Sequence, residues 1–287
     1  MDKLGKVFSI RESLITFLRE DIGKGDITSN SVIPGNASCQ AKIVCKSKTP
    51  AIVCGLEEAA MVFDICKCKY QILINDGSKV KKGVAVMDIH GKARSILKAE
   101  RTALNLVMRM SGIASETRKL VSLVTKYQNN IKIACTRKTA PGLRLLDKKA
   151  VTIGGGHPHR VDLYDMALIK DNHLIINGSI TKSIKLARKG IPSSKKVECE
   201  VVNLDQALEA IKSGADVIML DNFNPQKAAK TIKSLTRMKL RHKAMIEISG
   251  GITSKNVTSY AKAKPDIISI GYLTHSVQAI DFSLSVY

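Results

Sequence analysis

The sequence has no tryptophan, few aromatic residues and no long apolar run. Aromatic side chains make up 4% of the chain, too few to stack regularly between basic residues as single-strand nucleic-acid binding requires. No apolar stretch reaches membrane-spanning length, and Asp2, Lys3 and Lys6 interrupt the start where a signal peptide would have an apolar core. We therefore expect a cytoplasmic protein that neither crosses a membrane nor binds nucleic acid.

The seven cysteines lack the paired spacing of a zinc site, and the closest two are Cys66 and Cys68. We expect reduced, mostly buried thiols. Acidic residues are also scarce, since 25 of them face 46 basic residues and leave a net charge of +21. This charge favours anionic partners such as phosphates, carboxylates or nucleic acid. Much of it recurs at helical spacing over residues 227–243, where a solvated surface is the simpler interpretation.

The first part of the chain predicts a small α+β sandwich domain over residues 1–112. Short apolar stretches separated by Lys, Gly and Asp turns occupy residues 41–89, and a helix is expected over residues 56–65. A long helical pattern over residues 98–126 follows, with Gly112 as an expected kink or break. This helix is expected to bridge two domains.

Residues 113–275 alternate between strand-like apolar runs and helical segments, which indicates a parallel α/β sheet. The expected strands are 131–135, 150–153, 167–169, 197–201, 217–220, 244–248 and 267–270, and the expected helices are 180–189, 204–213, 225–235 and 254–263. Polar residues follow nearly every run, and in a barrel all these strand ends meet at one ligand. We therefore predict a TIM-like parallel α/β barrel, and the sequence leaves its completeness open. Residues 276–287 form a C-terminal segment, with packing on the N-terminal domain as one option.

Three strand ends carry cations. Arg137 and Lys138 directly follow one run, His159 and Arg160 follow three glycines, and Lys170 follows the next run. Each group alone would be a solvated turn. Their recurrence at successive strand ends instead favours a site for anions such as planar carboxylates.

The later strand ends carry acids and glycines. Glu200 and Asp221 end consecutive runs, where carboxylate oxygens could hold Mg²⁺ together with substrate phosphates. Ser249, Gly250 and Gly251 precede a predicted helix and are suited to a phosphate, as is Gly271 after the last strand.

These motifs carry a family resemblance that runs across nearly the whole chain. They are residues 20–28 (EDIGKGDIT), 100–105 (ERTALN), 111–114 (SGIA), 136–139 (TRKT), 154–160 (GGGHPHR), 168–173 (LIKDNH), 220–222 (LDN) and 249–252 (SGGI). In this order they resemble quinolinate phosphoribosyltransferase, the carboxylating nicotinate-nucleotide pyrophosphorylase (diphosphorylase). His157-Pro158 and Lys149 depart from residues that are frequent in the family.

The resemblance implies a pentosyltransferase of de novo NAD biosynthesis that joins quinolinate to phosphoribosyl pyrophosphate and releases CO₂. It implies that Arg137, Lys138, His159, Arg160 and Lys170 bind the two carboxylates and the phosphoribosyl donor. It also implies a homodimer, or a higher homo-oligomer, in which Arg101 comes from the neighbouring subunit.

The resemblance assigns further roles at the donor side. It places Glu200 and Asp221 on the ribose and metal side, and the segment 249–251 with Gly271 at the 5-phosphate. Lys138, Lys170, Glu200 and Asp221 are the candidate catalytic residues. Two alternatives stay open, namely a related enzyme that uses another base such as nicotinate, and a basic nucleic-acid-binding protein.

Overall fold

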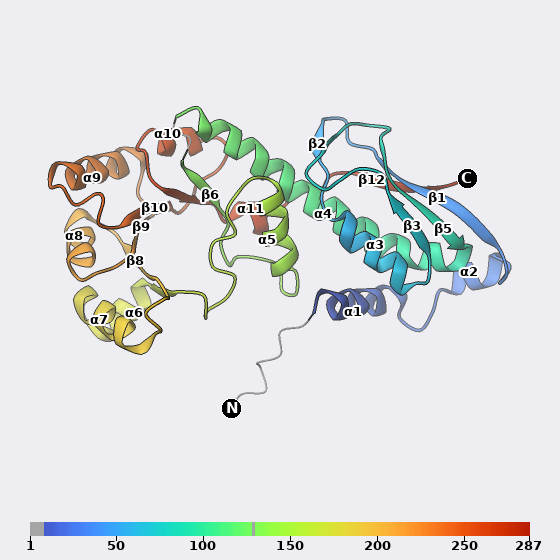
Figure 1. The fold of residues 1–287 in the computed structure, drawn as a ribbon, viewed down its shortest axis with the longest axis horizontal. Coiled ribbons are helices and arrows are strands. Elements are labelled where there is room, and N and C mark those ends of the chain that lie inside the picture. Colours follow the sequence, from blue (N-terminus) through green and yellow to red (C-terminus); the bar gives the residue numbers. More distant parts are fainter. Residues whose placement is uncertain (1–8, 128–129) are drawn as a thin grey trace. The chain divides into compact units, whose positions relative to one another are not determined.

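The computed structural model describes residues 9–127 and 130–287. Asp2, Lys3 and Lys6, which interrupt the start of the chain in the sequence, lie outside the described residues. The chain divides into two compact units (Figure 1). Unit 1 consists of Met1–Ser115 and Val277–Tyr287, and unit 2 is Glu116–Ser276. The boundaries expected from the sequence follow residues 112 and 275.

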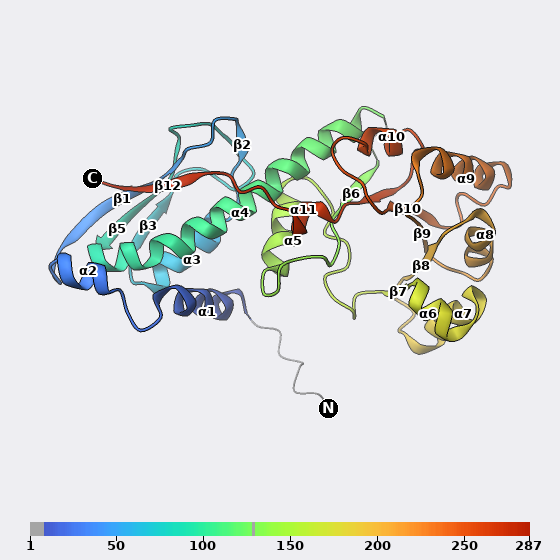
Figure 2. The ribbon, with the colours of Figure 1, turned by 180° about the vertical axis from the view of Figure 1, so that it is seen from behind.

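Unit 1 contains an antiparallel sheet of four strands in the order β12-β1-β5-β3. The strands of this unit are β1 (Ser38–Cys45), β2 (Ala51–Ile52), β3 (Lys69–Ile72), β4 (Lys79–Val80), β5 (Ala85–Lys92) and β12 (Phe282–Val286), of which β2 and β4 form a separate pair. Along β1, Ala41, Ile43 and Cys45 are fully buried and alternate with more exposed neighbours, as a strand with one face on a core requires. Figure 2 shows β12 beside β1, so segments far apart in the sequence share this sheet.

The helices of unit 1 are α1 (Ile10–Ile22), α2 (Ile27–Val32), α3 (Leu56–Ile65) and the first part of α4 (Ala93–Thr125). A capping box begins α1, because the side chains of Ser9 and Glu12 each accept the other residue's backbone N–H. The helix expected over residues 56–65 is confirmed as α3, which packs against β3 and β5.

Of the kink or break expected at Gly112, the break is wrong, because α4 continues through this residue. Close packing explains the glycine instead. A Cβ atom added to Gly112 would lie 2.3 Å from the backbone oxygen of Gln278. Only a residue without a side chain lets the segment that leads into β12 come this close to the helix.

Unit 2 contains a sheet of six parallel strands in the order β6-β11-β10-β9-β8-β7. They are β6 (Lys132–Ala134), β7 (Ala167–Ile169), β8 (Val197–Val201), β9 (Val217–Asp221), β10 (Met245–Ser249) and β11 (Ile267–Ser269). The predicted parallel α/β barrel with a smaller N-terminal sheet domain is therefore confirmed. Because β6 and β7 stand at the two ends of the strand order, the described strands leave the barrel incomplete.

The helices of unit 2 are the end of α4, then α5 (Arg144–Ile153), α6 (Asp171–Asn177), α7 (Ile180–Gly190), α8 (Leu204–Lys212), α9 (Pro225–Arg237), α10 (Val257–Ala261) and α11 (Tyr272–His275). Figure 1 shows α7, α8 and α9 along the outer side of the strands, where their apolar residues join one core. The strand expected over residues 150–153 is wrong, since these residues end α5. Ala150 and Val151 are buried there with Leu146 at helical spacing, and a short apolar run cannot distinguish such a helix from a strand.

A helix that could cross a membrane would have to be both long and apolar, and the described residues contain none of this kind.

Candidate active site

Side chains along the parallel strands alternate between the apolar core under the helices and the interior of the barrel. On the core side lie Ile169, Val197, Cys199, Val201, Ile218, Leu220, Ile246, Ile248 and Ile268. In the alternate positions lie Lys170, Glu200, Met219, Asp221, Glu247, Ser249 and Ser269, which line a single cavity. The two-residue period of the strands therefore gathers polar residues that are distant in sequence.

The cavity has a volume of about 550 Å³. Among the site residues predicted from the sequence, those that line it are Arg137, Lys138, His159, Arg160, Lys170, Glu200, Asp221, Ser249, Gly250 and Gly251. Gly271 lies just behind this lining, since a Cβ atom added to it would be 3.4 Å from Lys138 Cδ. Arg101 is an exposed residue of α4 in unit 1 and is not part of the lining. The structure thus brings most of the predicted residues together, while the ligand of each one stays a prediction.

Two guanidinium groups occupy one part of the cavity. Arg160 is almost fully buried, and burial lowers the pKa of its guanidinium, which the nearby charge of Arg137 lowers further. Arg137 has a buried Nε atom for which the described residues offer no hydrogen-bond partner. Two neighbouring cations with a free donor form a site that an anion would stabilise.

Glu200 and Asp221 occupy another part of the cavity, at the ends of β8 and β9. Lys170 Nζ lies 3.2 Å from Glu200 Oε1. Burial raises the pKa of the Glu200 carboxyl, a shift that Lys170 opposes and the charge of Asp221 reinforces. The two neighbouring acids therefore carry negative charge that a cation would relieve. Mg²⁺ prefers such oxygen ligands and keeps water or substrate phosphates as its remaining ligands, so the pair fits this ion.

A local turn holds Asp221 in place. Asn222, which follows it in the left-handed region with φ of 53°, donates from Nδ2 to Asp221 Oδ2 at 2.8 Å. Its backbone N–H donates to Ser249 O at 2.9 Å. Gly250 has φ of 101°, and a Cβ atom added to it would lie 2.2 Å from Asn222 Oδ1. The glycine is thus required by its own conformation and by the packing of Asn222.

The helix expected to begin at residue 254 begins at Val257 and contains only Val257–Ala261. Residues 252–256 between Gly251 and this helix are not helical. The helix therefore begins later than expected after Ser249, Gly250 and Gly251, and a role of its N-terminus at a phosphate stays a prediction. What the segment offers is the glycine turn itself.

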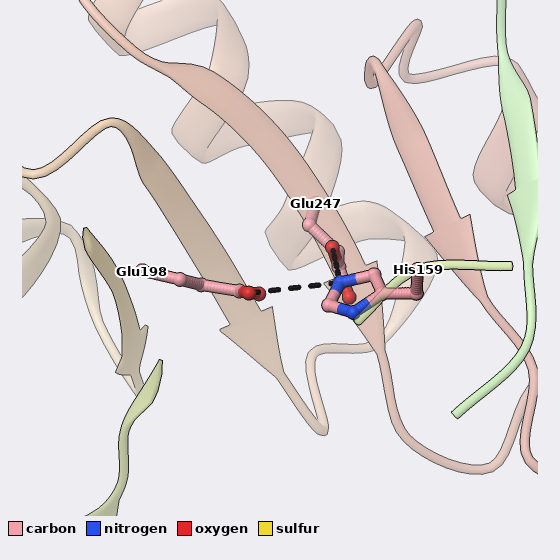
Figure 3. Close-up of side chains that lie close together, drawn as sticks. All are labelled: His159, Glu198 and Glu247. Atoms are coloured by element: carbon pink, nitrogen blue, oxygen red, sulfur yellow. Dashed lines mark hydrogen bonds and ion pairs between the residues drawn. The ribbon is translucent and has the colours of Figure 1, made fainter. Parts of the chain in front are cut away.

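Two buried acids, Glu198 in β8 and Glu247 in β10, were not among the residues predicted from the sequence. Figure 3 shows both carboxylates directed at the same ring nitrogen of His159, and Nε2 lies 2.9 Å from Glu247 Oε2 and 3.6 Å from Glu198 Oε2. Burial raises the pKa of the Glu198 carboxyl well above its ordinary value, and the charge of Glu247 raises it further. Among the described residues, these three form a group close enough to share a metal ion, and the predicted metal ligands Glu200 and Asp221 do not belong to it.

A sequence signal for both acids existed. Glu198 precedes Glu200 by one strand period, and Glu247 precedes Ser249 in the same way. A prediction that considers only strand ends overlooks residues that lie two positions earlier in the same strand. The alternation of each strand would have placed both acids on the side that faces the cavity.

Several buried polar atoms around the cavity find no hydrogen-bond partner within residues 9–127 and 130–287. They are Arg137 Nε, Ser269 Oγ, Glu247 Oε1 and both carboxylate oxygens of Glu198. A buried polar group without a partner costs about 1 to 3 kcal/mol, and native proteins contain few of them. Their concentration here indicates that this end of the barrel is built to receive a ligand.

Comparison with protein families gives two matches that together span most of the chain. Residues 26–111 match the family model "Quinolinate phosphoribosyl transferase, N-terminal domain", and residues 113–285 match its C-terminal domain. The N-terminal family model thus matches the first part of this chain, and the C-terminal family model matches the part that follows it.

Individual proteins agree with these matches. A protein of Methanocaldococcus jannaschii named probable nicotinate-nucleotide pyrophosphorylase (carboxylating) is 44% identical over 271 residues, which cover 94% of this chain and 94% of that protein. The human nicotinate-nucleotide pyrophosphorylase (carboxylating) is 34% identical, with 95% of this chain and 90% of that protein covered. The solved structure of nicotinate-nucleotide pyrophosphorylase from Francisella tularensis has a TM-score of 0.89 at 37% identity, with 100% of both chains covered.

Proposed function

Because this chain belongs to the quinolinate phosphoribosyltransferase family, we propose that it transfers a phosphoribosyl group from phosphoribosyl pyrophosphate to quinolinate and releases CO₂. The products are nicotinate mononucleotide, pyrophosphate and CO₂, as NAD biosynthesis requires. The observation that carries the proposal is the cavity of unit 2, in which the cations of one region and the acids of another meet at a single barrel end.

The cations bind the acceptor. Arg137 and Arg160 can each form paired hydrogen bonds to a planar carboxylate, and quinolinate carries two carboxylates on adjacent ring atoms. His159 and Lys138 complete this side of the cavity. Binding both carboxylates fixes the ring, so that its nitrogen faces the ribose.

The acids serve the donor. Glu200 and Asp221 would hold Mg²⁺, which when bound supplies positive charge to the pyrophosphate that leaves the ribose. The turn at Ser249, Gly250 and Gly251 would receive the 5-phosphate through backbone N–H groups. Lys170, already paired with Glu200, keeps that carboxylate oriented and would contribute its charge to substrate binding.

The reaction then needs two bond exchanges. The ring nitrogen of quinolinate forms a bond to the anomeric carbon while the carbon–oxygen bond to pyrophosphate breaks. The resulting cationic ring accepts the electron pair that remains when the 2-carboxylate leaves as CO₂, and a proton from solvent replaces it. The cations that line the cavity stabilise both charge movements.

We also propose that the protein acts as a homodimer in the cytoplasm. Leu163, Tyr164, Ile175 and Ile176 are exposed apolar residues of unit 2, and the last two lie in α6, whose first residue Asp171 lines the cavity. A second copy that covers this apolar region would place residues of its own near the cavity. The free thiols of all seven cysteines fit a reducing compartment.

Mixing two inactive variants tests the shared site. Arg101→Ala and Lys170→Ala should each be inactive, and in a mixed dimer one site carries both wild-type residues. With random exchange about half of the dimers are mixed, so roughly a quarter of wild-type activity should return. No recovery, although native mass spectrometry confirms subunit exchange, would place Arg101 in its own subunit's site or outside any site.

One assay tests the reaction. Purified protein should release CO₂ from quinolinate in the presence of phosphoribosyl pyrophosphate and Mg²⁺, with nicotinate mononucleotide identified by mass spectrometry. Nicotinate serves as the comparison acceptor. Turnover of nicotinate without quinolinate turnover would establish the alternative enzyme, and a folded protein that makes no product from either would contradict the proposal.

A further inference from the structure

His159 lines the cavity in an unusual backbone conformation. Its φ is 52°, in the left-handed region that residues with a side chain avoid. The conformation costs free energy and persists only where neighbouring groups impose it. It also determines where the imidazole of His159 lies, and it directs the following residue, Arg160, into the cavity.

The preceding residue, Pro158, is bound by a side chain of α5. Lys148, a buried residue of α5, donates a hydrogen bond from Nζ to the backbone oxygen of Pro158. Lys148 Nζ also lies 3.6 Å from Cys135 Sγ, and burial lowers the pKa of its amine. Lys148 itself does not line the cavity. The amine of Lys148 therefore binds the backbone directly before His159 and Arg160, which do line the cavity.

His157 holds His159 from the side. Its Nδ1 atom accepts the backbone N–H of His159 at 3.0 Å. The backbone of His157 is fixed in turn, because its N–H donates to Ile133 O at 2.7 Å and its oxygen accepts from Cys135 N at 3.3 Å. Burial and the charge of Lys132 lower the pKa of the His157 imidazole, which favours the neutral ring. The hydrogen bond from the backbone N–H of His159 then requires the lone pair to be on Nδ1.

We propose that His157 and Lys148 are positioning residues for the acceptor: together they hold His159 in its left-handed conformation, and so place His159 and Arg160 for carboxylate binding. This role rests on the proposed function of the cavity. Glu247 contacts the imidazole of His159 directly at 2.9 Å and fixes the side chain, whereas His157 and Lys148 fix the backbone. Neither of the two positioning residues needs to touch a substrate.

The decisive variants are His157→Ala and His157→Asn. Alanine removes the acceptor, and loss of one hydrogen bond should raise the KM for quinolinate about two- to tenfold, with little change in the KM for phosphoribosyl pyrophosphate. Asparagine can accept the N–H two residues ahead through its side-chain oxygen, so it should restore the wild-type KM. Lys148→Met, which keeps the length of the side chain and removes the donor, should reproduce the alanine effect. His242→Ala, at an exposed position of unit 2, is the matched control.

A double-variant cycle separates positioning from general loss of structure. Glycine adopts a positive φ without cost, so His159→Gly removes the conformational problem together with the imidazole. In that background, His157→Ala should have no further effect on the KM for quinolinate. Additive effects, an unchanged KM in His157→Ala, failure of asparagine to restore it, or equal rises in both KM values with a lowered melting temperature would each overturn the proposal.

The experiment also distinguishes this idea from the proposed function. If wild-type protein makes no product, amide hydrogen exchange at residue 159 replaces the kinetic measurement. His157→Ala should then accelerate exchange there, and His157→Asn should restore protection. Unchanged exchange in His157→Ala would overturn the positioning role whether or not the protein is an enzyme.

Discussion

The two ends of strand β9 carry the same residue type in opposite circumstances. Asp216 precedes the strand, and its Oδ2 accepts from the backbone N–H of Val197 at 2.7 Å and from Arg188 at 2.6 Å. Asp221 ends the strand at the cavity and lies beside Glu200, another acid. One oxygen of the first carboxylate is bound by two partners of the fold, whereas the second carboxylate lines the cavity that a ligand can enter.

The contrast extends to the neighbouring strands. Asp266, before β11, accepts from the backbone N–H of Ile246 at 2.6 Å and lies 2.8 Å from Arg241. On the side of the cavity, the described residues leave Arg137 Nε, Ser269 Oγ and Glu247 Oε1 without hydrogen-bond partners. The charged groups at the amino ends of the strands therefore stabilise the fold, whereas those at the carboxyl ends are available to bind a ligand.

The sharpest way to break this comparison is one substitution made at both ends of β9. Asp221→Asn should lower kcat by at least about 100-fold, because it removes negative charge from the proposed metal side while it keeps the size of the side chain. Quinolinate binding should remain. Asp216→Asn, the matched variant, should lower the melting temperature and leave kcat unchanged. Steady-state kinetics across a Mg²⁺ titration checks both, and an unaltered rate for Asp221→Asn would remove this residue from the site.

Arginine substitutions test the same contrast on binding. Arg137→Ala or Arg160→Ala removes a charged hydrogen bond worth about 1.5 to 3 kcal/mol, so quinolinate should bind roughly 10- to 100-fold more weakly. Phosphoribosyl pyrophosphate should lose much less affinity. Arg241→Ala, at the amino ends, should leave both affinities unchanged. Calorimetric titration with each ligand measures this, and an equal loss for both ligands would contradict the assignment of the arginines to the acceptor.

The sequence predicted the carboxyl ends better than it predicted the interior. Arg137, Lys170 and Asp221 directly follow or end apolar runs, and a strand that stops beside a charged residue is visible in the sequence. Glu198 and Glu247 lie within their runs, and an acid inside a strand is recognisable as a site residue only when the two-residue period is applied to it.

The errors of the sequence analysis have physical causes. A short apolar run such as residues 150–153 fits either a strand or the buried end of a helix, and in the folded protein it packs as part of α5. Gly112 was expected to interrupt α4 because glycine weakens helices, whereas its reason lies at Gln278, far away in sequence. The partner of Arg101 stays a prediction, since one chain does not contain it.

A third prediction concerns stability at the amino ends. Asp266→Ala removes the carboxylate that accepts from the backbone N–H of Ile246 and pairs with the guanidinium of Arg241. The free energy of unfolding should fall by about 1 to 3 kcal/mol, with kcat and both KM values retained. Urea denaturation followed by circular dichroism measures the loss. Loss of activity in a protein that is still folded would show that the amino ends also support the site.

The last prediction sharpens the comparison through the dependence of stability on pH. Burial, reinforced by the charge of Glu247, raises the pKa of the Glu198 carboxyl in the folded state above its unfolded value near 4.5. Below that pH both states hold the proton, and the stability that Glu198 contributes is fully present. As the pH rises, the unfolded state releases the proton first, so this contribution is lost progressively up to the folded pKa, at about 1.4 kcal/mol per unit of pKa difference.

Glu198→Gln cannot lose a proton. The variant should therefore gain stability relative to wild type between pH 5 and pH 8, and Glu20→Gln, at an exposed position in α1, is the matched control. Melting temperatures over this range measure the difference. A Glu198→Gln variant whose melting temperature stays parallel to that of wild type would show that the buried acid is compensated inside the fold, like Asp216 at the other end of the barrel.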